Sequence, residues 1–164
     1  NHFDIRLGDS CIWQLIALLC LVMSLVACTQ NSIKEVQITL DKQLEADNHY
    51  AQGDCEKAIP LYKTLSATMT SDTKSLLRLG NCYAKEKDYA QAEQAYQQAL
   101  SRDNSFTKAW YNLSYVRAQV LADTVMQMYK HVDPNSAEAK KIRELTLQVL
   151  APFGVNLDGD TIEE

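Results

Sequence analysis

The sequence predicts an all-α protein made of repeated helical hairpins that follow an export segment. Five Gly and three Pro in 164 residues are too few for the turns of an all-β fold, and helix-forming residues are plentiful. Shifting the chain by 34 residues aligns Ala58 with Ala92 and Tyr62 with Tyr96, which indicates an internal repeat. The net charge of −5 argues against nucleic acid as a partner.

The first element is predicted to be an export signal. Residues 10–33 carry no charged side chain, and the mostly apolar run 11–27 is short for a hydrocarbon layer about 30 Å thick. Its end resembles the bacterial lipobox, with Leu25, Val26 and Ala27 before Cys28. The resemblance implies cleavage after residue 27 and a diacylglycerol lipid with further acylation on Cys28, with no other cofactor. The alternative is an uncleaved signal anchor in which Cys28 is an ordinary apolar residue.

The segments on either side of this run carry two further predictions. Residues 1–10 have a net charge of −1 and begin with Asn, whereas a signal peptide begins with a positive segment, so we interpret them as a truncated or misassigned start. By resemblance to lipoprotein sorting, Thr29 after the lipidated cysteine implies the periplasmic face of a bacterial outer membrane. Residues 28–38 would be the anchor and a short tether, and a capping box of Ser32 and Glu35 predicts a helix start near Ile33.

The central segment 73–106 resembles a tetratricopeptide repeat. Its motifs are Leu76-x-x-Leu79-Gly80-x-x-Tyr83 and Asp88-Tyr89-x-x-Ala92-x-x-x-Tyr96-x-x-Ala99, and Asn104 stands where the family has Pro. The resemblance implies two antiparallel helices that approach closely at the small residues. Residues 39–72 form a first repeat with a turn at Gly53-Asp54, followed by Ala58 and Tyr62 in its second helix.

The third repeat is degenerate, so residues 107–151 are predicted to end the solenoid after two and a half to three repeats. Residues 107–132 lack Gly and Pro and form one extended helix in this prediction, with an apolar face of Leu121, Val125, Met128 and Val132. Asn135 with Glu138 would cap a last helix, about 136–151, with Ile142, Leu145 and Val149 on one face. Residues 152–164 form an acidic tail.

No residue pattern predicts an enzyme or a metal site. The histidines His2, His49 and His131 are scattered, and Asp158-Gly159-Asp160 is too short for a calcium loop. In the repeat geometry, Cys55 begins one helix and Cys82 lies late in its antiparallel neighbour, which predicts a disulfide between them. Two separately buried thiols are the alternative.

By resemblance to peptide-binding tetratricopeptide proteins, a concave face formed by the first helices would bind a protein or peptide with an acidic or carboxylate end. The residues implied for this face are Tyr50, Lys74, Leu77, Asn81, Lys85, Lys108, Tyr111, Tyr115 and Gln119. Asn81 and Asn112 match the chaperone-binding carboxylate clamp, but Leu77 stands where that clamp has Lys, so chaperone binding is not predicted. A solvated face without a ligand is the alternative.

Together these features predict a lipid-anchored, non-enzymatic periplasmic adaptor that binds another envelope protein. It is similar to the tetratricopeptide pilotins, lipoproteins of pilus and secretion systems. A structural subunit of an outer-membrane complex, which uses its convex or terminal-helix surface, is the alternative, and a homodimer would cover an open solenoid end.

Overall fold

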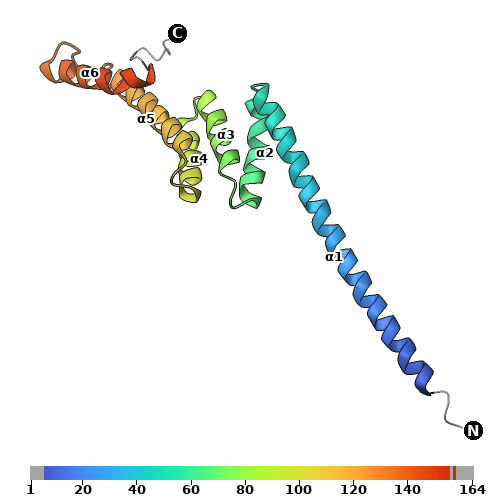
Figure 1. Ribbon diagram of the computed structural model, residues 1–164. Coiled ribbons are helices and arrows are strands. Elements are labelled where there is room, and N and C mark those ends of the chain that lie inside the picture. The colour runs from blue at the N-terminus through green and yellow to red at the C-terminus, as the bar shows by residue number, and fades with distance from the viewer. Residues whose placement is uncertain (1–5, 156, 158–164) are drawn as a thin grey trace, which may run out of the picture. The chain divides into compact units, whose positions relative to one another are not determined.

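The computed structural model describes residues 6–155 and 157, and within the first helix only some side chains before Ile33. The chain divides into two units, residues 1–42 and 43–164. The described residues form six α-helices and one short 3-10 helix (Figure 1).

Helix α1 (Arg6–Ala51) runs through both units, and no Gly or Pro interrupts the sequence between Gly8 and Gly53. The predicted start near Ile33 is therefore wrong, because Ser32 and Glu35 lie inside a continuous helix. Gly53, with φ of 74°, ends the helix in a left-handed conformation that favours glycine. The last turns of α1, beginning at Gln43, serve as the first helix of repeat one, where Ala46 is fully buried.

The next three helices begin at aspartate caps. Asp54, Asp72 and Asp88 each accept a hydrogen bond from a backbone N–H in the first turn of α2 (Cys55–Thr68), α3 (Thr73–Lys85) and α4 (Tyr89–Arg102), respectively. Neighbouring helices pack in sequence order, α2 on α3, α3 on α4 and α4 on α5 (Thr107–Met128) (Figure 1).

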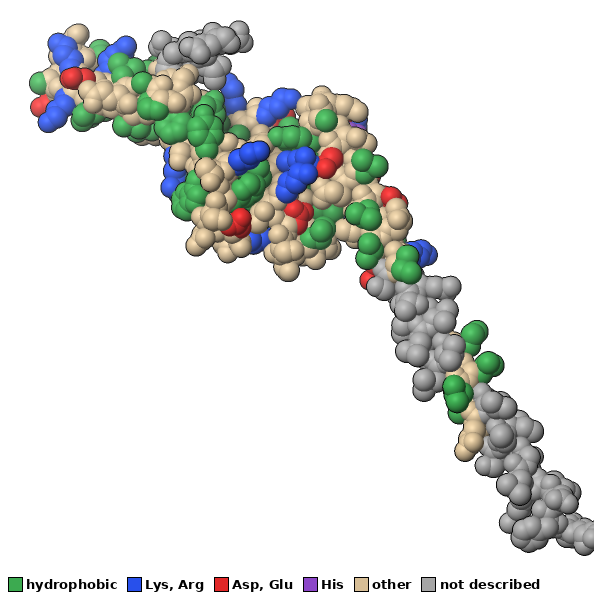
Figure 2. Space-filling view, viewed as in Figure 1, with side chains coloured by type: hydrophobic (Ala, Val, Ile, Leu, Met, Phe, Trp, Pro, Cys, Tyr) green, Lys and Arg blue, Asp and Glu red, His purple; other side chains and the backbone are tan. Residues whose placement is uncertain are grey.

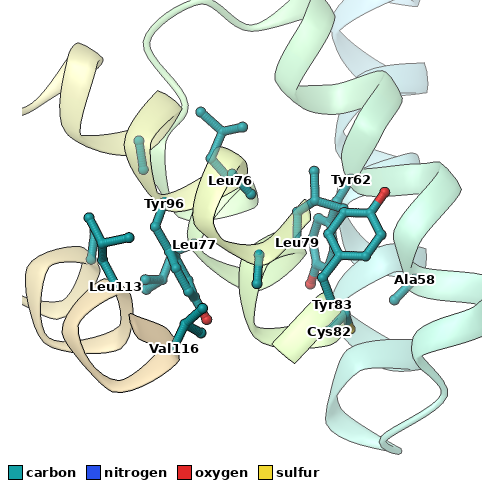
Figure 3. Close-up of a cluster of buried hydrophobic side chains, with 14 of the residues drawn as sticks. Ala58, Tyr62, Leu76, Leu77, Leu79, Cys82, Tyr83, Tyr96, Leu113 and Val116 are labelled. Carbon is teal, nitrogen blue, oxygen red and sulfur yellow. The ribbon is translucent and has the colours of Figure 1, made fainter. Parts of the chain in front are cut away.

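The repeat core is built from small and aromatic residues that fit together. A Cβ added at Gly80 would lie 2.8 Å from Cζ of Tyr96, so only glycine lets α4 approach α3 this closely. Tyr62, Leu76 and Tyr96 are almost fully buried in the same cluster (Figure 3). This packing agrees with the tight helix approach that the repeat resemblance implied.

The C-terminal part departs from the predicted boundaries. Helix α5 ends at Met128 rather than near residue 132, and Ser136 rather than Asn135 caps α6 (Ala137–Leu150) by accepting from the Ala139 N–H. A second hydrophobic cluster joins the C-terminal half of α5 to Leu150 and to residues near η1 (Ala151–Phe153).

Only some of the apolar residues that were predicted to form the buried faces of the last two helices are buried. In α5, Val125 is buried, and Leu121 and Met128 are partly buried against it, whereas Val132 is exposed beyond the end of the helix. In α6, Ala139, Thr146 and Leu150 are the buried residues. The predicted face of Ile142, Leu145 and Val149 is exposed instead.

Candidate binding groove

A groove of about 960 Å³ opens along the first helices of the repeats. We call this cavity the groove. Helix α3 supplies one part of the lining, α5 with the segment before it supplies another, and Tyr50 of α1 contributes its ring. Figure 2 shows basic and hydrophobic side chains beside one another over the repeat helices. The lining residues are Tyr50, Lys74, Leu77, Arg78, Asn81, Asp103, Ser105, Phe106, Thr107, Lys108, Tyr111 and Asn112.

Asn81 is the centre of the polar part of the groove. Its Nδ2 donates to the Tyr50 hydroxyl at 2.7 Å, and its Oδ1 accepts from the Tyr96 hydroxyl at 2.9 Å and from Asn112 Nδ2 at 2.7 Å. We call these four residues the Asn81 cluster. Burial raises the pKa of Tyr96, so this phenol stays a neutral donor. The cluster connects α1, α3, α4 and α5 through the Asn81 amide. Both hydrogen bonds that Asn81 Oδ1 accepts come from within the protein.

Arg78 lines the groove, but its charge is already paired. Its guanidinium forms an ion pair with Asp47 of α1 and lies 5.4 Å from the centre of the Tyr50 ring. Asp47 also accepts a hydrogen bond of 2.9 Å from Tyr62. Burial lowers the pKa of Arg78 from its ordinary value. Arg78 therefore fixes α1 against α3 and is not free to neutralise an incoming anion.

Lys74 and Lys108 are the cations that remain for a ligand. They come from α3 and α5, and neither forms an ion pair with a residue in the described part of the chain. Leu77, Phe106 and Tyr111 supply apolar surface in the same groove. The groove thus combines two available ammonium groups with an apolar floor, which suits an extended polypeptide that carries negative charge.

Six of the nine residues predicted for the concave face line the groove, and three lie elsewhere. Lys85 donates to the Gly53 carbonyl at 2.8 Å, so its ammonium serves the turn after α1. Gln119 donates to the Tyr115 hydroxyl at 2.8 Å, and Tyr115 packs against the second cluster. Arg78 and Phe106 also line the groove but were not predicted for this face. Arg78 follows from its position one helical turn from Lys74 and Asn81. Phe106 precedes the first residue of α5, so helical spacing does not identify it.

Cys55 and Cys82 are joined by a disulfide, with Cα atoms 5.2 Å apart. Cys55 is the first residue of α2, and Cys82 lies in the last turn of α3. The bond closes a loop of sequence separation 27 and ties repeat one to repeat two beside the groove.

The side chains of Leu25, Val26, Ala27 and Cys28 lie outside the described ones, as do Asp158 and the residues after it in the predicted tail. Within the described residues, no helix combines the length and the apolar character needed to cross a bilayer. The same part of the chain holds no group of three or more His, Cys, Asp or Glu side chains placed to bind a metal ion.

Packed helical hairpins and a groove along their first helices define the second unit as a helical-repeat structure. Residues 73–106 match the family model of the tetratricopeptide repeat, so the predicted resemblance is confirmed for this segment. A solved structure, the first TPR of Spaghetti (RPAP3) bound to the HSP90 peptide SRMEEVD, is similar at 22% identity and a TM-score of 0.49. The match covers 69% of this chain and 95% of that one. No curated protein matches the chain.

Proposed function

We propose that this chain is a non-enzymatic adaptor that binds a protein partner in the groove. The observation that carries the proposal is the pair of available lysines, Lys74 and Lys108, on either side of an apolar floor. An extended segment of the partner would place an acidic side chain or its C-terminal carboxylate between the two ammonium groups, and an apolar side chain on Tyr111 and Phe106.

The Asn81 cluster and Arg78 supply the rigidity that such a site needs. Because the polar groups of the cluster are bonded to one another and Arg78 is paired with Asp47, the walls of the groove are held in place before the partner arrives. A preformed site loses less conformational entropy on binding than a flexible one.

The lipobox at residues 25–28 supports the further proposal that the adaptor is anchored to a membrane through a lipid on Cys28. By the sorting resemblance of Thr29, the membrane is the periplasmic face of a bacterial outer membrane. A groove that binds an envelope protein there fits a pilotin-like role in pilus or secretion-system assembly, in which the lipid fixes the place and the repeats recruit the partner.

Peptide binding to the full chain tests the groove. The probe is a set of short peptides that end in acidic residues with either a free or an amidated C-terminus, measured by calorimetry. A charge-assisted hydrogen bond contributes about 1.5–3 kcal/mol, so Lys74→Gln or Lys108→Gln should each weaken binding about tenfold or more. Lys140→Gln with Lys141→Gln on α6 is the matched control and should leave the affinity unchanged. Equal binding by the groove variants and the control would exclude the groove.

A membrane-fractionation experiment tests the anchor separately. Wild-type chain should partition with the membranes and Cys28→Ala should not, because the substitution removes the acylated thiol. If Cys28→Ala stays in the membrane fraction, the segment is a signal anchor and the lipoprotein proposal fails.

A structural subunit is a second candidate, and the exposed apolar residues of α6 favour it. Ile142, Leu145 and Val149 recur at helical spacing and remain largely exposed. This candidate predicts that Leu145→Lys abolishes assembly with a complex or converts a dimer into a monomer in ultracentrifugation. The double variant Lys108→Gln with Tyr111→Ala should then have no effect, and α6 would be the interaction surface. The reverse result supports the groove.

A further inference from the structure

A smaller pocket of about 170 Å³ lies between α2 and α4, away from the groove. We call it the α2–α4 pocket. Lys63 and Ser66 of α2 and the glutamines of α4 form its rim, and Leu79 and Tyr83 of α3 form its floor. The complete lining is Lys63, Ser66, Leu79, Tyr83, Gln91, Gln94, Ala95 and Gln98.

The floor of this pocket holds an unsatisfied polar group. Tyr83 is only 8% exposed, and its hydroxyl has no hydrogen-bond partner among the described residues. Its ring lies in the repeat core near Leu79 and Tyr62 (Figure 3). A buried hydroxyl without a partner is unfavourable, and a ligand group that accepts a hydrogen bond from it would relieve this cost.

The rim offers donors that complement such an acceptor. The Lys63 ammonium lies 5.5 Å from the centre of the Tyr83 ring, and three glutamine amides face the same space from α4. No Asp or Glu is among the described residues that line the pocket. One positive charge, one phenol and several amide N–H groups therefore surround a space the size of a single side chain.

We propose that the α2–α4 pocket binds a carboxylate group. Its oxygens accept hydrogen bonds from Tyr83 and the glutamines, and its charge is balanced by Lys63. Ionised carboxylates accept without donating, which matches a site built from donors. The carboxylate has two sources to distinguish, the acidic side chain of a polypeptide and a free small acid.

The pocket is separate from the groove because α3 lies between them. At 100° per residue, the α3 residues of the groove, 74, 77, 78 and 81, are centred roughly 170° from Leu79 and Tyr83 on the helix. Substitutions in one site should leave the other intact, so this proposal stands or falls independently of the proposed function.

Nuclear magnetic resonance of the full chain, labelled in its tyrosine rings and glutamine amides, tests the proposal. The probes are sodium glutarate, a blocked Ala-Glu-Ala-Glu-Ala peptide and the same peptide with Gln in place of Glu. We expect saturable shifts of the Tyr83 ring and the α4 glutamine amides with a carboxylate probe and none with the Gln peptide. Tighter binding of the Glu peptide than of glutarate identifies a polypeptide source, and the reverse order identifies a free acid.

Variants decide whether the named donors are responsible. Tyr83→Phe and Lys63→Gln should each weaken binding about tenfold or more, whereas Lys74→Gln in the groove should not change it. Tyr83→Phe should also leave the melting temperature of the free chain unchanged or raised, because the lost hydroxyl had no partner. Absence of saturable binding, equal binding of the Gln peptide, or full affinity in both pocket variants would overturn the proposal.

Discussion

Replacing Asn81 with alanine should destabilise the chain by about 3 kcal/mol, because one amide satisfies three other polar groups. The largest part comes from the Tyr96 hydroxyl, which donates to Asn81 at 2.9 Å in a side chain that is 1% exposed. Leaving a buried donor unpaired costs about 1–3 kcal/mol. Tyr50 and Asn112 line the groove and can turn to water, so each adds about 0.5 kcal/mol.

Thermal and urea denaturation followed by circular dichroism measures this loss. For a chain of this length a loss of 3 kcal/mol lowers the melting temperature by about 6–12 °C. Asn48→Ala on the exposed side of α1 is the matched control and should change stability by less than about 0.5 kcal/mol. In a double-mutant cycle, Tyr96→Phe should restore part of the loss, because it removes the unpaired hydroxyl. A loss below about 1 kcal/mol in Asn81→Ala would refute the central role of this amide.

Three further predictions concern the repeat core. Gly80→Ala should lower the urea midpoint by the equivalent of about 1–3 kcal/mol, because the added Cβ overlaps the Tyr96 ring; an unchanged midpoint would contradict this packing. Replacing both Cys55 and Cys82 with alanine should cost about 3.5 kcal/mol for a loop of separation 27, and reductant should destabilise the wild type but not this variant. Stability should fall above about pH 10, where unfolded tyrosines lose their proton, because burial raises the pKa of Tyr62 and Tyr96; Tyr96→Phe should reduce this loss in alkaline denaturation scans.

The repeated hairpin could be predicted because its determinants are local. Small residues recur where Ala46 aligns with Gly80 and Ala58 with Ala92, and an aromatic residue recurs where Tyr62 aligns with Tyr96. An aspartate cap marks the start of each of α2, α3 and α4. These signals depend on spacing along one chain segment and on side-chain size. Both are visible in a sequence.

The groove could be predicted only in part because the third repeat departs from the pattern. Mapping family positions onto Tyr115 and Gln119 predicts that both side chains face the groove, but neither lines it and Gln119 is buried within α5. The second half of α5 packs with the C-terminal segment, so those two side chains bond to each other there. Lys85 was assigned by position alone, and its ammonium instead reaches a backbone carbonyl in a neighbouring turn.

Helix ends are hard to predict from sequence for a different reason, which is that neighbouring residues can offer competing capping signals. Asn135 and Ser136 are both good capping residues and stand side by side, so a sequence offers no basis for choosing the one that accepts from Ala139. Ser32 and Glu35 form a capping box in sequence, yet no Gly or Pro precedes them closely enough to stop the helix that begins at Arg6.

Helix α3 lines both proposed binding sites and presents a different set of polar groups to each. Toward the groove it offers the Lys74 ammonium. The Arg78 charge is paired with Asp47, and the Asn81 amide is hydrogen-bonded within its cluster. Toward α2 and α4 it offers the Tyr83 hydroxyl, which has no hydrogen-bond partner in the part of the chain that the structure describes. Since the two faces share no side chain, a partner with two acidic segments could occupy both at once. Substitutions at Lys74 and Lys63 should then weaken its binding additively, as expected for sites that do not contact one another.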